Sequence, residues 1–188
     1  MKHVLSGRGM LEAVLMGEIP RETTGSQHSI NFAQVVRQRE AQVLRTAFRI
    51  LGNWADAEDV AQEVFLRLHK NGLKFENEAA IGGWLYRVTV NLCVDRTRSA
   101  RPGQELTELA SRDRSAEATV LLEEKKQRLM EALAMLPAKE RAAVVLREIE
   151  GLSTAEVAAA LGSTEVTVRS QISKAMVKLR GILNREDV

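Results

Sequence analysis

The sequence predicts an all-α protein built as two small helical domains that an acidic, flexible linker joins. Aromatic residues make up only 4% of the chain and proline occurs three times, a composition that favours helices. Apolar residues recur at intervals of three and four over most of the 188 residues. Pro102 and Gly103 break this pattern, and an acidic stretch follows them.

Residues 1–29 carry several glycines and a polar run, so we expect a loosely ordered arm there. Glu12 interrupts the one apolar stretch in this arm, which makes a poor signal-peptide core. No run approaches the roughly 18 apolar residues of a membrane span, so we expect no membrane insertion. The lone Cys93 excludes an intramolecular disulfide and suits a reducing compartment. These observations predict a cytoplasmic protein.

The first domain, residues 30–100, begins with two predicted helices. The first covers residues 30–51 and ends at Gly52 and Asn53. The second follows in WADAEDVAQEVFLRLHKNG, where Asp56 and Asp59 lie in the first turn, at the end of the helix dipole that favours carboxylates. Six residues at helical spacing form its predicted buried face: Ala57, Val60, Ala61, Val64, Phe65 and Leu68.

Asp59 and Glu63 lie four residues apart and therefore share a face of this helix, with Gln62 beside them. Paired carboxylates can serve acid–base or metal chemistry. No His-rich or Gly-rich segment accompanies them, and the chain shows no nucleophile–base pair, metal cluster or phosphate loop. We therefore expect no enzyme, no metal and no cofactor, and interpret this face as a binding surface for a basic partner helix.

A polar loop at residues 71–80 carries Phe75, and a third helix is predicted over residues 80–101. Its predicted helical stripe comprises Ile81, Trp84, Leu85, Val88, Leu92 and either Val94 or Asp95. Four arginines oppose the single acid Asp95, and aromatic residues are interleaved with them. This combination suits a nucleic-acid strand separated from its duplex, because bases stack on rings while arginines follow phosphates. The alternative is that Trp84 and Tyr86 are core or interface aromatics, which we favour for Trp84.

The linker is predicted at residues 101–118, within a stretch (104–124) that holds six acidic and two basic residues. The second domain, residues 119–188, then begins with a helix over residues 120–136. Pro137 opens a further helix, which ends at Gly151. Two basic domains therefore flank an acidic connection.

Residues 151–183 read as two helices with a tight turn at Gly162, where a left-handed residue ends the first. Ser153 or Thr154 can cap the first helix, with Glu156 placed to complete a capping box, and Thr164 can cap the second. The second helix has one apolar stripe: Val168, Ile172, Ala175, Met176, Leu179 and Leu183. Five basic residues against one acidic residue occupy positions 164–185. A basic amphipathic helix alone is often just a solvated surface, but together with the turn it describes a DNA-binding helix-turn-helix.

Three segments follow one another along the chain in this order: DAEDVAQEVFLRL, WLYRVTVNLCVDRTR, and LPAKERAAVVLREIEGLSTAEVAAALGSTEVTVRSQISKAMVKLR. This order resembles the extracytoplasmic-function (ECF) sigma factors, the compact promoter-recognition subunits of bacterial RNA polymerase, over residues 30–183. The resemblance implies a region 2 helical bundle, a region 4 helix-turn-helix, and core polymerase and promoter DNA as partners. Members of this family are commonly held by an anti-sigma factor, so such a partner is implied as well.

The resemblance also implies three sets of site residues. Those that dock on the clamp coiled coil of core polymerase are Asp59, Gln62, Glu63 and Phe65. Those that capture the melted minus-ten strand are Lys74, Phe75, Glu76, Asn77, Arg87, Asn91, Arg96 and Arg98. Those that read the minus-thirty-five duplex are Thr167, Arg169, Ser170, Ser173, Lys174 and Lys178. The segment 136–151 corresponds to the part of region 4 that binds the β-flap, and the acidic linker to the part that passes through the polymerase cleft.

The chain departs from the family pattern at three positions of the helix-turn-helix: Ser163 stands where an aliphatic residue is usual, Val166 where a small one is, and Lys174 where arginine is. Lysine lacks the bidentate fork of arginine, so the base preference at that contact stays open. The alternative function is a stand-alone helix-turn-helix regulator. That alternative leaves the acidic helix and the Trp84–Arg87 segment unexplained, and such a regulator normally dimerises on a palindrome.

Overall fold

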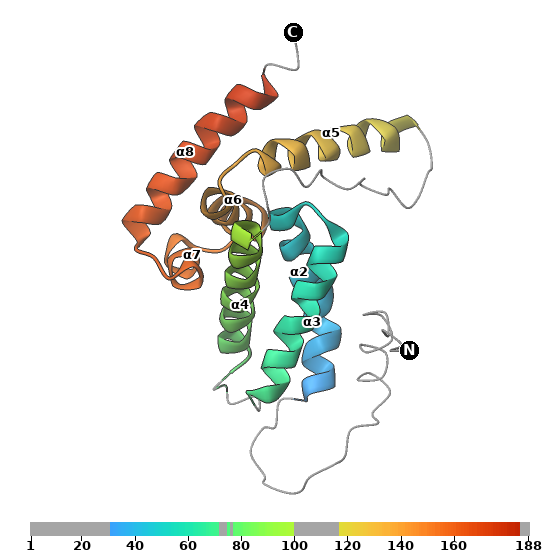
Figure 1. Cartoon of the computed structure of the whole chain (residues 1–188), viewed down its shortest axis with the longest axis vertical. Helices are drawn as coiled ribbons and strands as arrows, with labels where there is room; N and C mark the ends of the chain where they lie inside the picture. The colour runs from blue at the N-terminus through green and yellow to red at the C-terminus, as the bar shows by residue number, and fades with distance from the viewer. Residues whose placement is uncertain (1–30, 72–74, 76, 100–116, 185–188) are drawn as a thin grey trace, which may run out of the picture.

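The computed structural model describes residues 31–71, 75, 77–99 and 117–184 (Figure 1). The predicted N-terminal arm and nearly all of the predicted linker lie outside these residues. The described part contains helices and no strand, so the all-α prediction is confirmed. The helical elements are α2 (Phe32–Leu51), α3 (Trp54–Lys70), α4 (Glu78–Ser99), α5 (Glu117–Ala134), α6 (Ala138–Val144), η1 (Val145–Ile149), α7 (Thr154–Leu161) and α8 (Glu165–Leu183).

Helices α2, α3 and α4 form the N-terminal module, in which each helix packs against the other two. Helix α2 ends where Gly52 adopts a left-handed φ of 76°, and its N–H donates to the Phe48 carbonyl at 2.7 Å. Asn53 then caps α3 by accepting from the Asp56 N–H. The six residues predicted as the buried face of α3 are all buried.

Helices α5 to α8 form the C-terminal module, in which α8 packs against α5, α6 and α7. Ser153 and Glu156 make the complete capping box at the start of α7, and Gly162 ends α7 with a φ of 58°. Thr164 caps α8 by accepting from the Thr167 N–H. The predicted helix-turn-helix is therefore present, with its second helix oriented by local hydrogen bonds on both sides of the turn.

Two predicted helices of this module differ in detail. Helix α5 begins at Glu117 rather than at residue 120. The helix predicted after Pro137 is α-helical only to Val144 and continues as a π-helix, closed by the Glu150 N–H donating to the Val145 carbonyl at 3.0 Å. Gly151, with a φ of 76°, then ends the helical run. A wider turn of this kind rarely continues far and is often found at functional sites.

The two modules pack against one another and share one continuous apolar core. Helix α7 packs beside α4 (Figure 1), and α2 contacts α5, α6 and η1. This packing corrects the predicted core face of α4. Thr89, Val90 and Cys93 are fully buried, whereas the predicted core residues Trp84 and Val88 are only half-buried. The reason is that the C-terminal module covers a second side of α4, which a search for a single apolar stripe does not anticipate.

Candidate nucleic-acid and polymerase interface

Helix α8 presents one face to the core and the opposite face to solvent. Val168, Ala175 and Leu179 are buried against the rest of the C-terminal module. Five of the residues predicted to read duplex DNA are exposed on the other side: Thr167, Arg169, Ser170, Ser173 and Lys174. Most of them lie in the N-terminal half of the helix, the half that reaches base edges when such a helix enters a major groove.

Three of the predicted duplex-reading residues make side-chain contacts within the chain. The hydroxyl of Thr167 lies 2.9 Å from that of Thr164. Arg169 pairs with Glu165 one turn earlier at 2.7 Å, and both side chains are largely exposed. An exposed pair of this type is weak, so DNA phosphates or bases can displace Glu165. Lys178 bonds to Glu140 of α6 at 2.8 Å, and Glu140 is only 15% exposed. Lys178 therefore holds α8 against α6 and is turned away from the centre of the exposed face.

Val166 was not among the predicted site residues, yet it is 72% exposed and shares the face of Ser170 and Ser173. An exposed apolar side chain at the start of such a helix is suited to contact with the methyl group of thymine. The signal was present in the sequence, because Val166 lies outside the stripe that includes Val168. In the sequence alone, Val166 stands out only as a departure from the family pattern.

Helix α4 carries an exposed stripe of donors along its length. Arg87, Asn91 and Arg98 are exposed and spaced by four and seven residues, which places them on one side of the helix. Asp95 lies beside the stripe, with its carboxylate 3.8 Å from Arg98, a distance that gives only a weak pair. The structure thus brings three of the four predicted strand-binding residues of this helix together.

Arg96, the fourth, is directed toward α3. Its guanidinium contacts the carboxylates of Asp56 and Asp59, each at 2.7 Å. Burial alone lowers the pKa of Arg96, but the hydrogen bonds and charges of the two aspartates outweigh it and raise the pKa above its usual value. Arg96 therefore links α3 to α4, and it joins a residue predicted to bind DNA to one predicted to bind polymerase.

The loop before α4 is described only in part, and Lys74 and Glu76 lie outside the described residues. The ring of Phe75 meets Trp84 edge to face, with centroids 5.7 Å apart. The side-chain oxygen of Asn77 accepts from the Ala80 N–H at 2.9 Å and so caps α4. The half-buried rings of Phe75 and Trp84 form an aromatic pair at the start of α4, next to the exposed donor stripe of that helix.

The face of α3 predicted to dock on polymerase is acidic at its N-terminal end. Asp59 is exposed, and Glu63 is partly exposed and pairs with Arg67 at 2.7 Å. Gln62 is partly buried, whereas Phe65 is only 3% exposed and belongs to the core. Carboxylates and an amide on this face can therefore meet a basic surface, while Phe65 supports the helix from inside.

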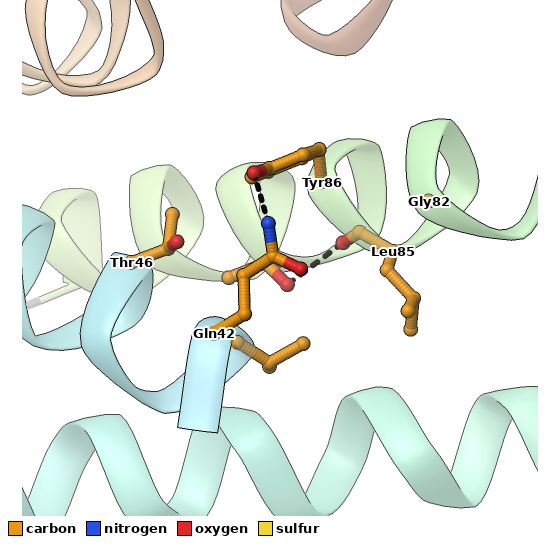
Figure 2. A pocket seen from close by; sticks show the side chains of 7 residues that line it. Gln42, Thr46, Gly82, Leu85 and Tyr86 are labelled. Carbon is orange, nitrogen blue, oxygen red and sulfur yellow. Dashed lines mark hydrogen bonds between the residues drawn. The ribbon is translucent and has the colours of Figure 1, made fainter. Parts of the chain in front are cut away.

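Among the described residues, no group of His, Cys, Asp or Glu is arranged to hold a metal ion. No helix in that same part of the chain is long and apolar enough to cross a membrane. A small pocket, roughly the size of one water molecule, lies between α2 and α4. Figure 2 shows Gln42 reaching across it from α2 to the hydroxyl of Tyr86 on α4.

Comparisons with known proteins agree with this division into two modules. The family model "Sigma-70 region 2" matches residues 35–102, and "Sigma-70, region 4" matches residues 126–179. The ECF RNA polymerase sigma factor SigM of Mycobacterium tuberculosis is 32% identical over 157 residues, which cover 81% of this chain and 76% of SigM. SigE of Mycolicibacterium smegmatis, also named an ECF RNA polymerase sigma factor, is 36% identical over 169 residues, 86% of this chain but only 65% of SigE.

Two solved structures share the fold. CnrH, solved in complex with the cytosolic domain of CnrY, is 23% identical with a TM-score of 0.63, covering 96% of this chain and 99% of CnrH. The sigma factor RpoE from Bartonella quintana, solved in complex with the anti-sigma factor NepR, is 21% identical with a TM-score of 0.66, covering 81% of this chain and 96% of RpoE. At these identities the likeness concerns the fold alone.

Proposed function

The chain belongs to the ECF RNA polymerase sigma factors, and we propose that it directs promoter-specific initiation by bringing core polymerase to two promoter elements. The observation that supports this most strongly is the pair of exposed donor faces on separate modules, one on α4 and one on α8. The action is binding rather than catalysis. We place it in the cytoplasm, where bacterial core polymerase works.

Helix α8 reads the minus-thirty-five duplex from the major groove in this proposal. Arg169 leaves Glu165 and pairs with a guanine or a phosphate, since arginine to guanine is the commonest specific contact. Ser170, Ser173 and Lys174 supply further donors, and Val166 contacts a thymine methyl. Lys178 fixes the angle of α8 through Glu140 and reaches at most the edge of the duplex.

The stripe of Arg87, Asn91 and Arg98 on α4 holds the separated minus-ten strand, with Phe75 and Trp84 next to it as apolar surface for an unpaired base. Taking a base out of the stack costs a few kcal/mol. The contacts that three exposed donors can make with the strand are too few to offset that cost over the whole minus-ten element. The free chain should therefore melt DNA poorly, and contacts made with polymerase must supply the rest.

Asp59, Gln62 and Glu63 meet the clamp coiled coil of core polymerase, and Phe65 positions them from the core. In the C-terminal module, the exposed apolar side chains of Met135 and Ile149 suit the β-flap. An anti-sigma factor is a further partner that fits this family. No residue of the described surface identifies where it binds.

A run-off transcription assay with core polymerase and a promoter library tests the proposal. Added protein should create new, sequence-dependent start sites that core polymerase alone does not use. Tight, specific duplex binding without polymerase, together with no new start site, would instead support the alternative of a stand-alone helix-turn-helix regulator.

Two substitutions separate the two modules. Arg169→Ala should cost about 1 to 3 kcal/mol of discrimination at the minus-thirty-five element and leave the affinity for core polymerase unchanged. Asp59→Ala should weaken polymerase binding and leave base preference unchanged. Matched controls are Arg45→Ala on α2 and Glu58→Ala on α3, both exposed residues outside the proposed sites. If Arg169→Ala and Asp59→Ala impair the same step, the assignment of separate roles is wrong.

A further inference from the structure

The carboxylate of Glu150, in the C-terminal module, receives all of its described hydrogen bonds from the N-terminal module. Arg49 of α2 donates at 2.6 Å, Thr46 of α2 at 3.0 Å, and the hydroxyl of Tyr86 of α4 at 3.2 Å. The Glu150 side chain is only 9% exposed and that of Arg49 is 28% exposed. Gln42 in turn donates to the Tyr86 oxygen across the small pocket (Figure 2). We call these five residues the Glu150 cluster.

A second contact crosses the same boundary next to the cluster. Arg141 of α6 is 7% exposed and donates to the carbonyl of Ile50 at 2.6 Å, in the last turn of α2. It also donates to the carbonyls of Ala134 and Leu136, at the end of α5. The guanidinium thus satisfies carbonyls at the negative ends of two helices, one from each module.

These hydrogen bonds depend on distance and direction, whereas the apolar packing between α4 and α7 is non-directional. Bonds to a charged group in a partly buried place are roughly twice as strong as neutral ones. They also require the donors of α2 and α4 to lie in one arrangement around Glu150. The cluster therefore selects one relative position of the modules, which we call the closed state.

The closed state does not allow both proposed DNA contacts at once. A compact fold the size of the described residues has a radius of gyration of about 14 Å, hence a diameter of about 36 Å. The minus-ten and minus-thirty-five elements lie about 25 base pairs apart, which is about 85 Å along the duplex at about 3.4 Å per step. In the structure α4 is in contact with α7, the helix directly before α8 (Figure 1). The modules must separate before both elements can be read.

We propose that the Glu150 cluster holds the free chain in the closed state and thereby restrains it from binding promoter DNA and core polymerase productively. The inhibitory consequence rests on the proposed function, whereas the closed state itself does not. Separation of the modules removes all of these donors from Glu150 together, so the cluster makes opening a single step.

Distances between two spin labels measure the closed state directly in the free chain. Gly83→Cys on α4 and Gly181→Cys on α8 are suitable label sites, because a Cβ atom added at either position meets no atom within 4 Å. The native Cys93 is fully buried in the closed state but lies on the part of α4 that the C-terminal module covers. Every labelled chain therefore also carries Cys93→Ala, so that no native thiol competes for the label once the modules separate. The parent chain should give one short, narrow distance distribution.

Arg49→Glu and Glu150→Lys, each made separately, should shift the distribution to longer and broader distances, with at least about a tenfold change in the ratio of open to closed molecules. The double variant with both changes recreates an opposite-charge pair and should restore most of the short distance. Glu148→Lys changes an exposed acid on the same segment and should have no effect. Far-ultraviolet circular dichroism shows whether each variant stays folded, and Glu150→Gln provides a milder change if one does not.

A parent chain that is already open, or single variants that stay closed, would overturn the proposal.

A binding experiment with core polymerase then tests the inhibitory consequence. It uses Arg49→Glu, since Arg49 lies in none of the proposed binding faces. Relative to the parent chain, the apparent affinity of the Arg49→Glu variant for core polymerase should rise by about the same factor as the fraction of open molecules. An open variant with unchanged affinity would show that closure is not inhibitory. A parent chain that stimulates no transcription would contradict the proposed function and leave the distance result standing.

Discussion

At the scale of single residues, side chains that look alike in the sequence have very different surroundings. Arg87 and Arg98 are exposed on α4, whereas Arg96 between them is fixed by two aspartates of α3. Arg141 is buried on carbonyl groups, and its pKa is lowered by burial. The type of residue could be read from the sequence, but the partner that determines its role could not.

Tyr86 gives a direct measurement at this scale, because it is the only tyrosine of the chain. Burial, with the nearby Glu150 carboxylate as a second cause, raises the pKa of Tyr86 from 10 to about 12. Absorbance titration should therefore give a midpoint near pH 12 in the folded chain and near 10 in denaturant. Since the folded-state pKa is the higher one, the stability that the neutral hydroxyl contributes is complete below pH 10 and lost as the pH rises toward 12.

Glu150→Gln is the matched variant for this titration. Removing the negative charge should lower the Tyr86 pKa toward 10, and Glu148→Gln should leave it unchanged. A midpoint near 10 in the folded parent chain would show that Tyr86 faces water rather than the Glu150 cluster.

At the scale of elements, the start of α7, the first helix of the helix-turn-helix, is fixed by hydrogen bonds between neighbours in the chain. The Ser153 hydroxyl accepts from the Glu156 N–H at 3.2 Å, and the Glu156 carboxylate accepts from the Ser153 N–H at 2.7 Å. These bonds lower the pKa of Glu156. The stability that they contribute is therefore present above the ordinary glutamate pKa and is lost as the pH falls through the lowered value.

Ser153→Ala removes half of this capping box. The free energy of unfolding should fall by about 1 kcal/mol, the usual cost of replacing a serine cap by alanine. Urea denaturation followed by circular dichroism measures the change, with Ser163→Ala, on the other side of α7, as the control. A loss below about 0.5 kcal/mol, the usual scatter among surface substitutions, would show that the box is unimportant in the folded chain.

Most elements could be predicted because their signals are local. The buried face of α3, the glycine stops at Gly52 and Gly162, and the cap at Thr164 all follow from residues within a few positions of one another. The π-helical turn of η1 could not be predicted, since the apolar pattern before Gly151 fits an α-helix equally well. The resemblance implies a DNA contact for Asn77, whereas its role as the cap of α4 follows from the backbone geometry.

At the scale of the whole molecule, the packing of the modules was beyond the reach of sequence patterns. Glu150 lies 104 positions from Thr46 and 64 from Tyr86, and Arg141 lies 91 from Ile50. No periodicity joins residues so far apart. Val90 and Cys93 on α4 are fully buried because of this interface. Their burial could be explained only when the position of α7 against α4 was known.

The proposed function makes a prediction about promoter spacing that concerns both modules together. Once polymerase holds the modules at a set separation, five extra base pairs between the two elements rotate one element by about half a helical turn relative to the other. Run-off transcription should then fall at least about tenfold. A chain that tolerates the insertion would have modules that move independently on polymerase, contrary to the proposal.

The contact between Arg141 and the end of α2 also has a consequence for synthesis on the ribosome. The Ile50 carbonyl is made 91 residues before its guanidinium partner. At about 5 to 20 residues per second, this delay is about 5 to 18 s. During that interval α2, α3 and α4 emerge, with the side of α4 that α7 later covers still uncovered. A nascent chain is therefore accessible to other molecules before its own second half can restrain it.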